Sequence, residues 1–200
     1  AANDAELPGL AYRLDRAGVV WTPDHPACRW PASGSPRIPE DNALVAIFDR
    51  GRERFVSAPG GGDLTSTLEQ YTGDADDRFT LERVGPGLVA FKASNGAYVS
   101  AACETDALTP IATDVGPRET FRWIERPNGD VVLRSIGGGG HLVRSVTREL
   151  AGGITLEILV ADADHAGVAE TNYVILDGRT PQSAPAAPAS ATENTPAPGP

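Results

Sequence analysis

The amino-acid sequence predicts an all-β domain made of three related units, each with four short strands. Three observations lead to this prediction. Short apolar segments recur three times in one order, turn residues separate them, and residues 42–178 show no helical apolar period. Repetition at a fixed spacing indicates one supersecondary unit used several times. Short apolar or alternating runs bounded by Gly, Asp, Asn or Pro are typical of strands.

Four segments make up each unit. The first segments are 44–48, 88–92 and 131–134, the second 54–58, 97–101 and 141–145, the third 63–65, 107–109 and 153–155, and the fourth 79–82, 121–124 and 173–176. The first segments begin 44 and 43 residues apart, but Phe121 and Tyr173 in the last two fourth segments lie 52 residues apart. We therefore expect about ten inserted residues in the third unit, between Thr155 and Tyr173.

Two Asn-Gly pairs predict tight hairpins. Asn95-Gly96 and Asn128-Gly129 each separate two apolar segments, and Asn-Gly supplies the positive φ angles that a two-residue hairpin requires. An antiparallel barrel with a hairpin cap accommodates twelve such strands and leaves few exposed edges. Three units are too few for a propeller but sufficient for a β-trefoil, which is the fold we predict.

The second unit carries the most specific motif, since residues 89–101 read VAFKASNGAYVSA. This stretch resembles the signature of the fascin-like branch of the β-trefoil superfamily, and residues 55–58 keep part of it. The resemblance covers about residues 42–178 and implies a fold that serves lectins, filament cross-linkers, inhibitors and growth factors alike. The Gln-x-Trp motif of ricin-type lectins is missing from all three closing segments, so their sugar sites are not carried over.

Composition divides the chain into three zones. Prolines interrupt residues 1–41, which we expect to form an irregular arm packed on the barrel. Residues 42–178 hold the repeats. Residues 179–200 are almost wholly Pro, Ala, Ser and Thr and cannot bury enough apolar surface to become ordered. We expect a disordered tail that links to a further domain or surface, or that serves as a ligand for a proline-reading domain.

The N-terminal zone contains three aromatic residues, Tyr12, Trp21 and Trp30, and one of the two cysteines. The aromatic rings could cover one end of the barrel or form a carbohydrate-stacking surface. Cys28 and Cys103 lack the close spacing of a metal or redox pair. They are either one long-range disulfide or two buried thiols.

Charge and hydropathy restrict the partners. A net charge of -10 argues against nucleic acid and anionic membranes, which both attract Lys and Arg. No apolar window approaches the roughly 18 residues of a membrane span, so no membrane insertion is expected. The chain begins Ala1-Ala2-Asn3 and contains no methionine, which we interpret as the mature form of a secreted or periplasmic protein. Its single lysine, Lys92, favours a bacterial source.

Two acidic clusters are the candidate binding site. They contain Asp74, Asp76 and Asp77 in the first unit and Asp162 and Asp164 in the third. Both precede a closing segment, and alternating carboxylates are able to converge on calcium. Tyr71 is a candidate stacking surface for a ligand beside the first cluster. The alternative is that both clusters are solvated turns.

No catalytic residue is predicted. The three histidines, His25, His141 and His165, form no metal-ligand motif, and no serine lies in a Gly-x-Ser-x-Gly turn. The sequence therefore favours a non-catalytic binding module that recognises a glycan through trefoil loops. The alternative is a protein-interaction or inhibitor module that docks through the predicted 156–172 loop.

Overall fold

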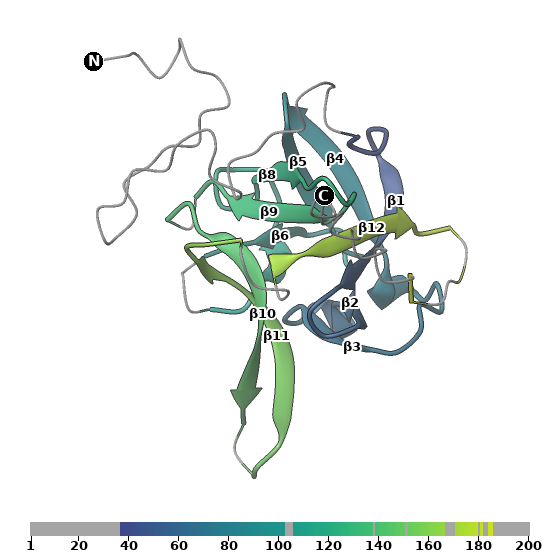
Figure 1. Cartoon of the computed structure of the whole chain (residues 1–200), viewed down its shortest axis with the longest axis vertical. Coiled ribbons are helices and arrows are strands. Elements are labelled where there is room, and N and C mark those ends of the chain that lie inside the picture. The colour runs from purple at the N-terminus through teal and green to yellow at the C-terminus, as the bar shows by residue number, and fades with distance from the viewer. Residues whose placement is uncertain are drawn as a thin grey trace, which may run out of the picture.

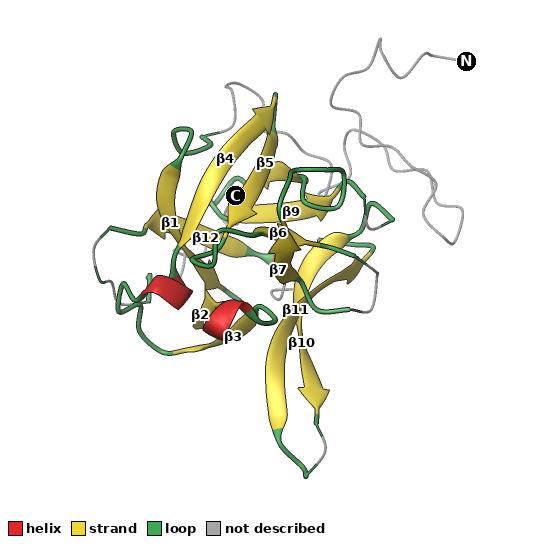
Figure 2. Ribbon diagram, turned by 180° about the vertical axis from the view of Figure 1, so that it is seen from behind, coloured by secondary structure: helices red, strands yellow, loops and turns green. Residues whose placement is uncertain are grey.

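The computed structural model describes residues 37–102, 106–137, 139–150, 152–166, 171–179, 181, 184 and 185. In this part of the chain twelve strands follow one another: β1 (Ala43–Asp49), β2 (Arg54–Ser57), β3 (Thr65–Leu68), β4 (Phe79–Gly85), β5 (Leu88–Lys92), β6 (Tyr98–Ser100), β7 (Thr109–Ala112), β8 (Phe121–Glu125), β9 (Val131–Ser135), β10 (Leu142–Glu149), β11 (Thr155–Ala163) and β12 (Tyr173–Asp177). Two short 3₁₀ turns, Pro59–Gly61 and Ala75–Asp77, accompany them (Figure 2). Among these residues no helix is long and apolar enough to cross a membrane.

The Asn-Gly pairs lie at hairpin turns, as the sequence predicts, but each turn is a three-residue loop in which the glycine and not the asparagine has a positive φ angle. Gly96 and Gly129 adopt φ angles of 79° and 84°, in the region that favours glycine. The Asn95 Oδ1 atom accepts a hydrogen bond from the N–H of Ala97 at 2.9 Å, which closes the turn between β5 and β6. Side-chain bonds of this kind are the reason that asparagine is frequent in turns.

Six of the strands close a barrel. Antiparallel pairing runs from β1 to β4, β5, β8, β9 and β12, and then from β12 back to β1. The other six form the hairpins β2–β3, β6–β7 and β10–β11. Each unit therefore supplies two barrel strands and one hairpin (Figure 1). This is the β-trefoil arrangement, and it confirms the three internal repeats.

A ring of three backbone hydrogen bonds marks the pseudo-three-fold axis. Leu64 N–H donates to the carbonyl of Leu108 at 2.8 Å, Leu108 N–H to Leu159 at 2.7 Å, and Leu159 N–H to Leu64 at 3.0 Å. Leu159 is therefore the third-unit equivalent of Leu64 and Leu108. The predicted equivalence of residues 153–155 is wrong, because Gly-Ile-Thr has the pattern of the third segment but lies five residues before the segment of β11 that reaches the axis.

The insertion in the third unit consequently lies in the β10–β11 hairpin. Eight residues separate Val56 from Leu64 and nine separate Val99 from Leu108 in the first two units, whereas sixteen separate Val143 from Leu159. The predicted insertion at 156–172 is therefore misplaced. Residues 155–163 form strand β11. The additional residues lengthen the β10–β11 hairpin at the end that carries its turn.

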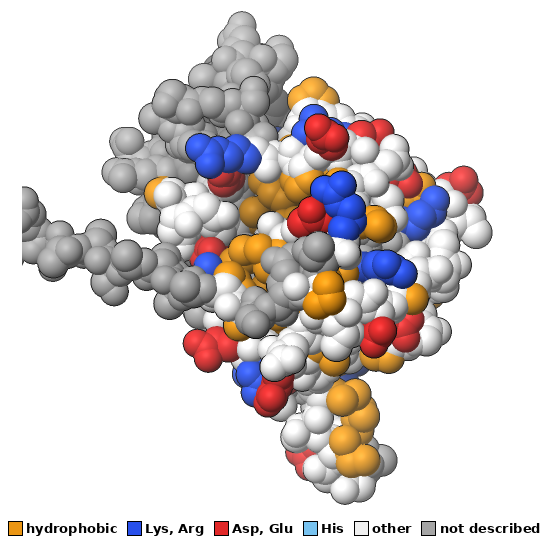
Figure 3. Space-filling view, turned by 90° about the vertical axis from the view of Figure 1, so that its right-hand side faces the viewer, with side chains coloured by type: hydrophobic (Ala, Val, Ile, Leu, Met, Phe, Trp, Pro, Cys, Tyr) orange, Lys and Arg blue, Asp and Glu red, His pale blue; other side chains and the backbone are white. Residues whose placement is uncertain are grey.

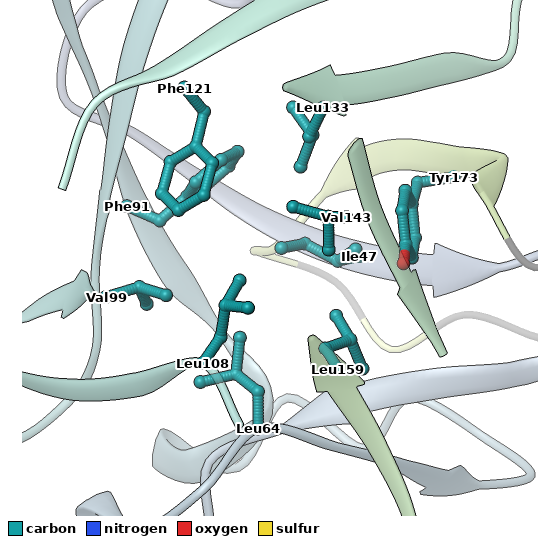
Figure 4. Close-up of a pocket in the computed structure, with 10 residues that line it drawn as sticks. All are labelled: Ile47, Leu64, Phe91, Val99, Leu108, Phe121, Leu133, Val143, Leu159 and Tyr173. Atoms are coloured by element: carbon teal, nitrogen blue, oxygen red, sulfur yellow. The ribbon is translucent and has the colours of Figure 1, made fainter. Parts of the chain in front are cut away.

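The core is filled by the same four positions of each unit. These are Ile47, Phe91 and Leu133, then Val56, Val99 and Val143, then Leu64, Leu108 and Leu159, and finally Phe79, Phe121 and Tyr173. Figure 4 shows ten of these side chains meeting at the centre, around a void of only ≈ 10 Å³. That space is at the lower limit for one water molecule, so any ligand has to bind on the outside of the barrel.

The described start of the chain is attached to the barrel. Ile38 packs against the core, and the N–H of Arg37 donates to Glu125 Oε2 at 2.8 Å. Asp41 Oδ1 accepts a hydrogen bond from the N–H of Arg83 at 2.8 Å. These contacts hold residues 37–41 against β4 and β8.

Three predictions about the chain ends lie outside the described residues. They concern the packing of residues 1–36, the Cys28–Cys103 disulfide, and the tail beyond residue 185.

Candidate functional site

The acidic cluster of the first unit holds loops together. Asp76 Oδ2 accepts a hydrogen bond from the N–H of Gly60 at 2.9 Å, and its Oδ1 accepts one from Ser94 Oγ at 3.1 Å. Asp77 is buried and accepts a hydrogen bond from Thr72 Oγ1 at 2.9 Å. Burial raises the pKa of Asp77, and the neighbouring charge of Asp74 acts in the same direction. Within this cluster Asp74 alone is fully exposed.

Tyr71 belongs to the core. Its side chain is 1% exposed, and its ring lies 5.8 Å from that of Phe55. Its hydroxyl donates to the carbonyl of Gly178, just after the last strand. The prediction of a stacking surface at Tyr71 is wrong, because no face of this ring is open to a ligand.

The acidic residues of the third unit are engaged in pairs. Asp162 lies in strand β11, rather than in the predicted loop, and its two oxygens accept hydrogen bonds from Arg144 at 2.6 and 2.8 Å. Asp164 Oδ1 lies 2.8 Å from Nδ1 of His141. In the described part of the chain no group of three or more His, Cys, Asp or Glu side chains is placed to hold a metal ion.

The extended β10–β11 hairpin is the most prominent surface feature. Figures 1 and 2 show it projecting well beyond the barrel. Its last pairing with the body is Ile158 with Thr65, and the described residues nearer the turn pair only across the hairpin. We call residues 147–157 the arm. The arm is a two-stranded ribbon whose residues on both strands reach solvent.

The arm has two chemically different faces. Directly opposed residues of a hairpin share a face. Arg148 with Leu156 and Leu150 with Ile154 therefore continue the apolar face that Val146 and Ile158 begin at the body. Leu150 is 41% exposed and Ile154 is 60% exposed. In Figure 3 hydrophobic side chains cover the face of the projecting hairpin turned to the viewer.

The opposite face of the arm is polar. Thr147 faces Glu157, and Glu149 faces Thr155. Thr147 Oγ1 donates to Glu157 Oε1 at 2.8 Å. Glu157 Oε2 also forms an ion pair with Arg52 Nε of the body at 2.9 Å. This ion pair holds the base of the arm in one orientation.

Glycines shape the turn at the end of the arm. Gly152 and Gly153 adopt φ angles of 91° and 76°, which other residues rarely tolerate. Leu150 N–H donates to the carbonyl of Ile154 at 2.7 Å, and Gly153 N–H donates to the carbonyl of Leu150 at 3.2 Å. The turn therefore presents Leu150 and Ile154 side by side.

A buried carboxyl group lies beneath the arm. Asp49 Oδ1 accepts hydrogen bonds from the N–H groups of Gly51 at 2.9 Å and Arg52 at 3.2 Å. The side chains of Ser66 in β3 and Ser145 in β10 lie near the same carboxyl group, but neither hydroxyl nor Asp49 Oδ2 has a hydrogen-bond partner in the described part of the chain. Burial raises the pKa of Asp49, against the opposing effect of the polar groups around it. Asp49 thus orients the backbone at Gly51 and Arg52.

A polar cleft of ≈ 680 Å³ opens on another side of the first unit. Its lining includes Phe48, Arg50, Glu53, Arg54, Glu69, Gln70, Asn128, Asp130, Asn172, Ala184 and Pro185. Arg50 Nε donates to Asp130 Oδ1 at 3.2 Å, and Asn128 Nδ2 donates to Asp130 Oδ2 at 2.9 Å. We call it the Arg50 cleft. No local sequence pattern indicates this cleft, since its residues come from five separate stretches of the chain.

Aromatic side chains contribute almost no exposed area to these surfaces, although Phe48 lines the Arg50 cleft. Every aromatic residue in the described part of the chain is buried, namely Phe48, Phe55, Tyr71, Phe79, Phe91, Tyr98, Phe121, Trp123 and Tyr173. Trp123 lies in the core, as predicted. Neither the arm nor the Arg50 cleft therefore presents an exposed ring from this part of the chain.

Comparison with known proteins supports the fold. A designed three-fold symmetric protein, ThreeFoil, is similar to this chain with a TM-score of 0.56 and 13% sequence identity, over 67% of this chain and 98% of that one. The fold is a β-trefoil. At this identity the likeness carries no information on function. No family model matches the chain and no curated protein matches it in sequence, so membership of the fascin-like branch stays a prediction.

Proposed function

We propose that this chain is a non-catalytic, protein-binding module that docks onto its partner through the arm. One observation carries the proposal. Leu150 and Ile154 stand exposed, side by side, at the end of a hairpin that the other two units keep short. Contiguous exposed apolar surface on a soluble domain is typical of interaction sites. The β-trefoil fold is compatible with such a binding role.

The energetics favour docking into an apolar groove. Complete burial of one Leu or Ile side chain contributes about 1.5–3 kcal/mol. The arm is held in advance by the Arg52–Glu157 ion pair and by the glycine turn. A preformed element loses little conformational entropy on binding, so more of this energy appears as affinity.

The first experiment identifies where the partner docks. A photo-crosslinking amino acid is placed at Ile154 and, as a matched control, at Ile111 in β7, which is 64% exposed. Both positions carry the same accessible side chain. A partner captured from Ile154 and not from Ile111 assigns docking to the arm. Equal capture from the two positions, or none from Ile154, would contradict the proposal.

The captured partner is then titrated against two variants. We expect Leu150→Ser/Ile154→Ser to weaken binding at least about ten-fold, because ten-fold in Kd corresponds to ~1.4 kcal/mol and two buried side chains supply more. Ile111→Ser should bind as the unmodified chain does. Calorimetry measures both affinities. Equal affinities for the two variants would overturn the role of the arm.

Glycan binding in the Arg50 cleft is a second candidate. Guanidinium, carboxylate and amide groups line the cleft, and these groups hydrogen-bond to sugar hydroxyls. It ranks below protein docking because the described aromatic rings are buried, which leaves the cleft without a stacking surface. The test is a glycan array with and without calcium, comparing Asn128→Ala with Asp74→Ala. Binding to one sugar family that only Asn128→Ala abolishes would support it.

A further inference from the structure

Residues that follow the last strand form one wall of the Arg50 cleft. After β12 ends at Asp177, the N–H of Gly178 donates to the carbonyl of Leu44 at 2.9 Å. Pro181 then lies against Gly73, where an added Cβ atom would meet its Cγ at 3.9 Å. Ala184 and Pro185 line the cleft itself. The described residues after β12 therefore contact the first unit and form part of the wall of the cleft.

One hydrogen bond anchors this segment. Arg50 Nη1 donates to the carbonyl oxygen of Pro185 at 3.1 Å. The guanidinium is oriented for that bond, since its Nε is held by Asp130 and it lies 5.8 Å from the ring of Phe48. Asp130 is buried and is itself fixed by Asn128. The cleft thus presents a prearranged donor to the tail.

The chemistry of the tail suits this site. Proline-rich segments favour an extended conformation with free carbonyl groups and few N–H donors. Arginine is the complementary residue, because it carries five donors and no acceptor. Prolines also reduce the conformational freedom lost on docking. The sequence PQSAP over residues 181–185 has the composition that these requirements call for.

We propose that the Arg50 cleft is a binding site for an extended, proline- and alanine-rich peptide, and that the chain's own Ala184 and Pro185 already take up one side of it. The tail is then an intramolecular ligand. Its attachment close to the cleft gives it a high effective concentration. A glycan or a peptide from another protein would have to displace it. This inference concerns a different surface from the arm and stands independently of the proposed function.

The test uses the full-length chain and a proline-specific endopeptidase. Mass spectrometry follows the rate of cleavage after Pro185, with cleavage after Pro198 as the reference within the same molecule. Docking shields the bond after Pro185, so loss of the anchoring hydrogen bond in Arg50→Ala should raise the ratio of the two rates about five-fold. Arg54→Ala is the control, because Arg54 also lines the cleft but forms an ion pair with Glu69.

A second variant distinguishes loss of the anchoring hydrogen bond from unfolding of the chain. Arg50→Ala leaves the buried Asp130 carboxylate without its guanidinium, whereas Arg50→Gln/Asp130→Asn removes both charges together. Circular dichroism melting confirms that each variant is folded before cleavage is measured. An increase in the cleavage ratio for the folded Arg50 variants, with none for Arg54→Ala, supports the proposal. An unchanged ratio in the folded Arg50→Gln/Asp130→Asn chain overturns it, as does an equal increase in Arg54→Ala.

Discussion

At the scale of single residues, Asp49 and Asp77 carry carboxyl groups that are buried in the folded chain. Burial raises the pKa of both above the ordinary value of 3.8. Each group therefore binds its proton more tightly in the folded chain than in the unfolded one. Their contribution to stability is present below the unfolded-state pKa and is lost as the pH rises through the raised folded-state pKa.

The Asp49→Asn variant tests whether the contribution of Asp49 to stability falls as the pH rises. The amide oxygen can still accept from the N–H groups of Gly51 and Arg52, and the amide NH₂ group can donate to the nearby hydroxyls of Ser66 and Ser145. We expect the variant to be more stable than the unmodified chain at pH 7, on the order of 1 kcal/mol, because a buried charge is removed. The advantage should vanish below pH 3.8, where Asp49 is protonated in both states.

Calorimetric melting between pH 3 and pH 8 measures the difference in Tm between the two proteins. Asp74→Asn serves as a control, since Asp74 is exposed. A difference that does not change with pH would show that the charge of Asp49 has no part in it.

At the scale of elements, the arm is an addition to a complete barrel. Units one and two form the same kind of hairpin with strands of only three or four residues, whereas β10 has 8 and β11 has 9. Two-stranded ribbons contribute little stability of their own. We therefore expect the arm to contribute little to the stability of the barrel.

Replacement of residues 147–157 by Asn-Gly tests whether the arm is dispensable for folding. Val146 and Ile158 are directly opposed, so a two-residue turn can join them. We expect the free energy of unfolding to fall by no more than about 1 kcal/mol, largely from the loss of the Arg52–Glu157 ion pair. Urea unfolding measures it. A loss of several kcal/mol would show that the arm is part of the folding core.

At the scale of the whole molecule, the pseudo-three-fold axis determines which residues are equivalent. Leu64, Leu108 and Leu159 complete one hydrogen-bonded ring and are all buried. Their side chains meet at the centre of the barrel (Figure 4). Because the core is close-packed, the same substitution at equivalent positions should lower the free energy of unfolding by similar amounts.

Alanine substitution at the three axial leucines tests this equivalence. We expect each variant to lose about 2–5 kcal/mol, because a buried Leu→Ala change removes apolar contacts and leaves a cavity. Ile154→Ala is the comparison, and it should change the stability by less than about 0.5 kcal/mol, since the side chain is exposed. Chemical denaturation measures all four variants. If Leu159→Ala behaved like Ile154→Ala, the alignment of the third unit would be wrong.

The sequence alone determined the fold of this protein, its three repeats and its Asn-Gly hairpins. These features depend on local chemistry, since apolar periodicity and turn residues act over a few positions. It also placed Trp123 in the core. Its third-unit alignment failed because Ile154 and Thr155 repeat the local pattern of the axial segment while lying in the arm.

Only the tertiary structure decided which side chains are free to bind. Asp76 is bonded to Ser94, Tyr71 to Gly178, and Arg50 to both Asp130 and Pro185. These partners are distant in sequence, so no local pattern records them. Tyr71, the predicted ligand residue, is buried in the core. The apolar end of the arm is exposed instead. Sequence repetition specifies how strands pair, but long-range packing determines what remains on the surface.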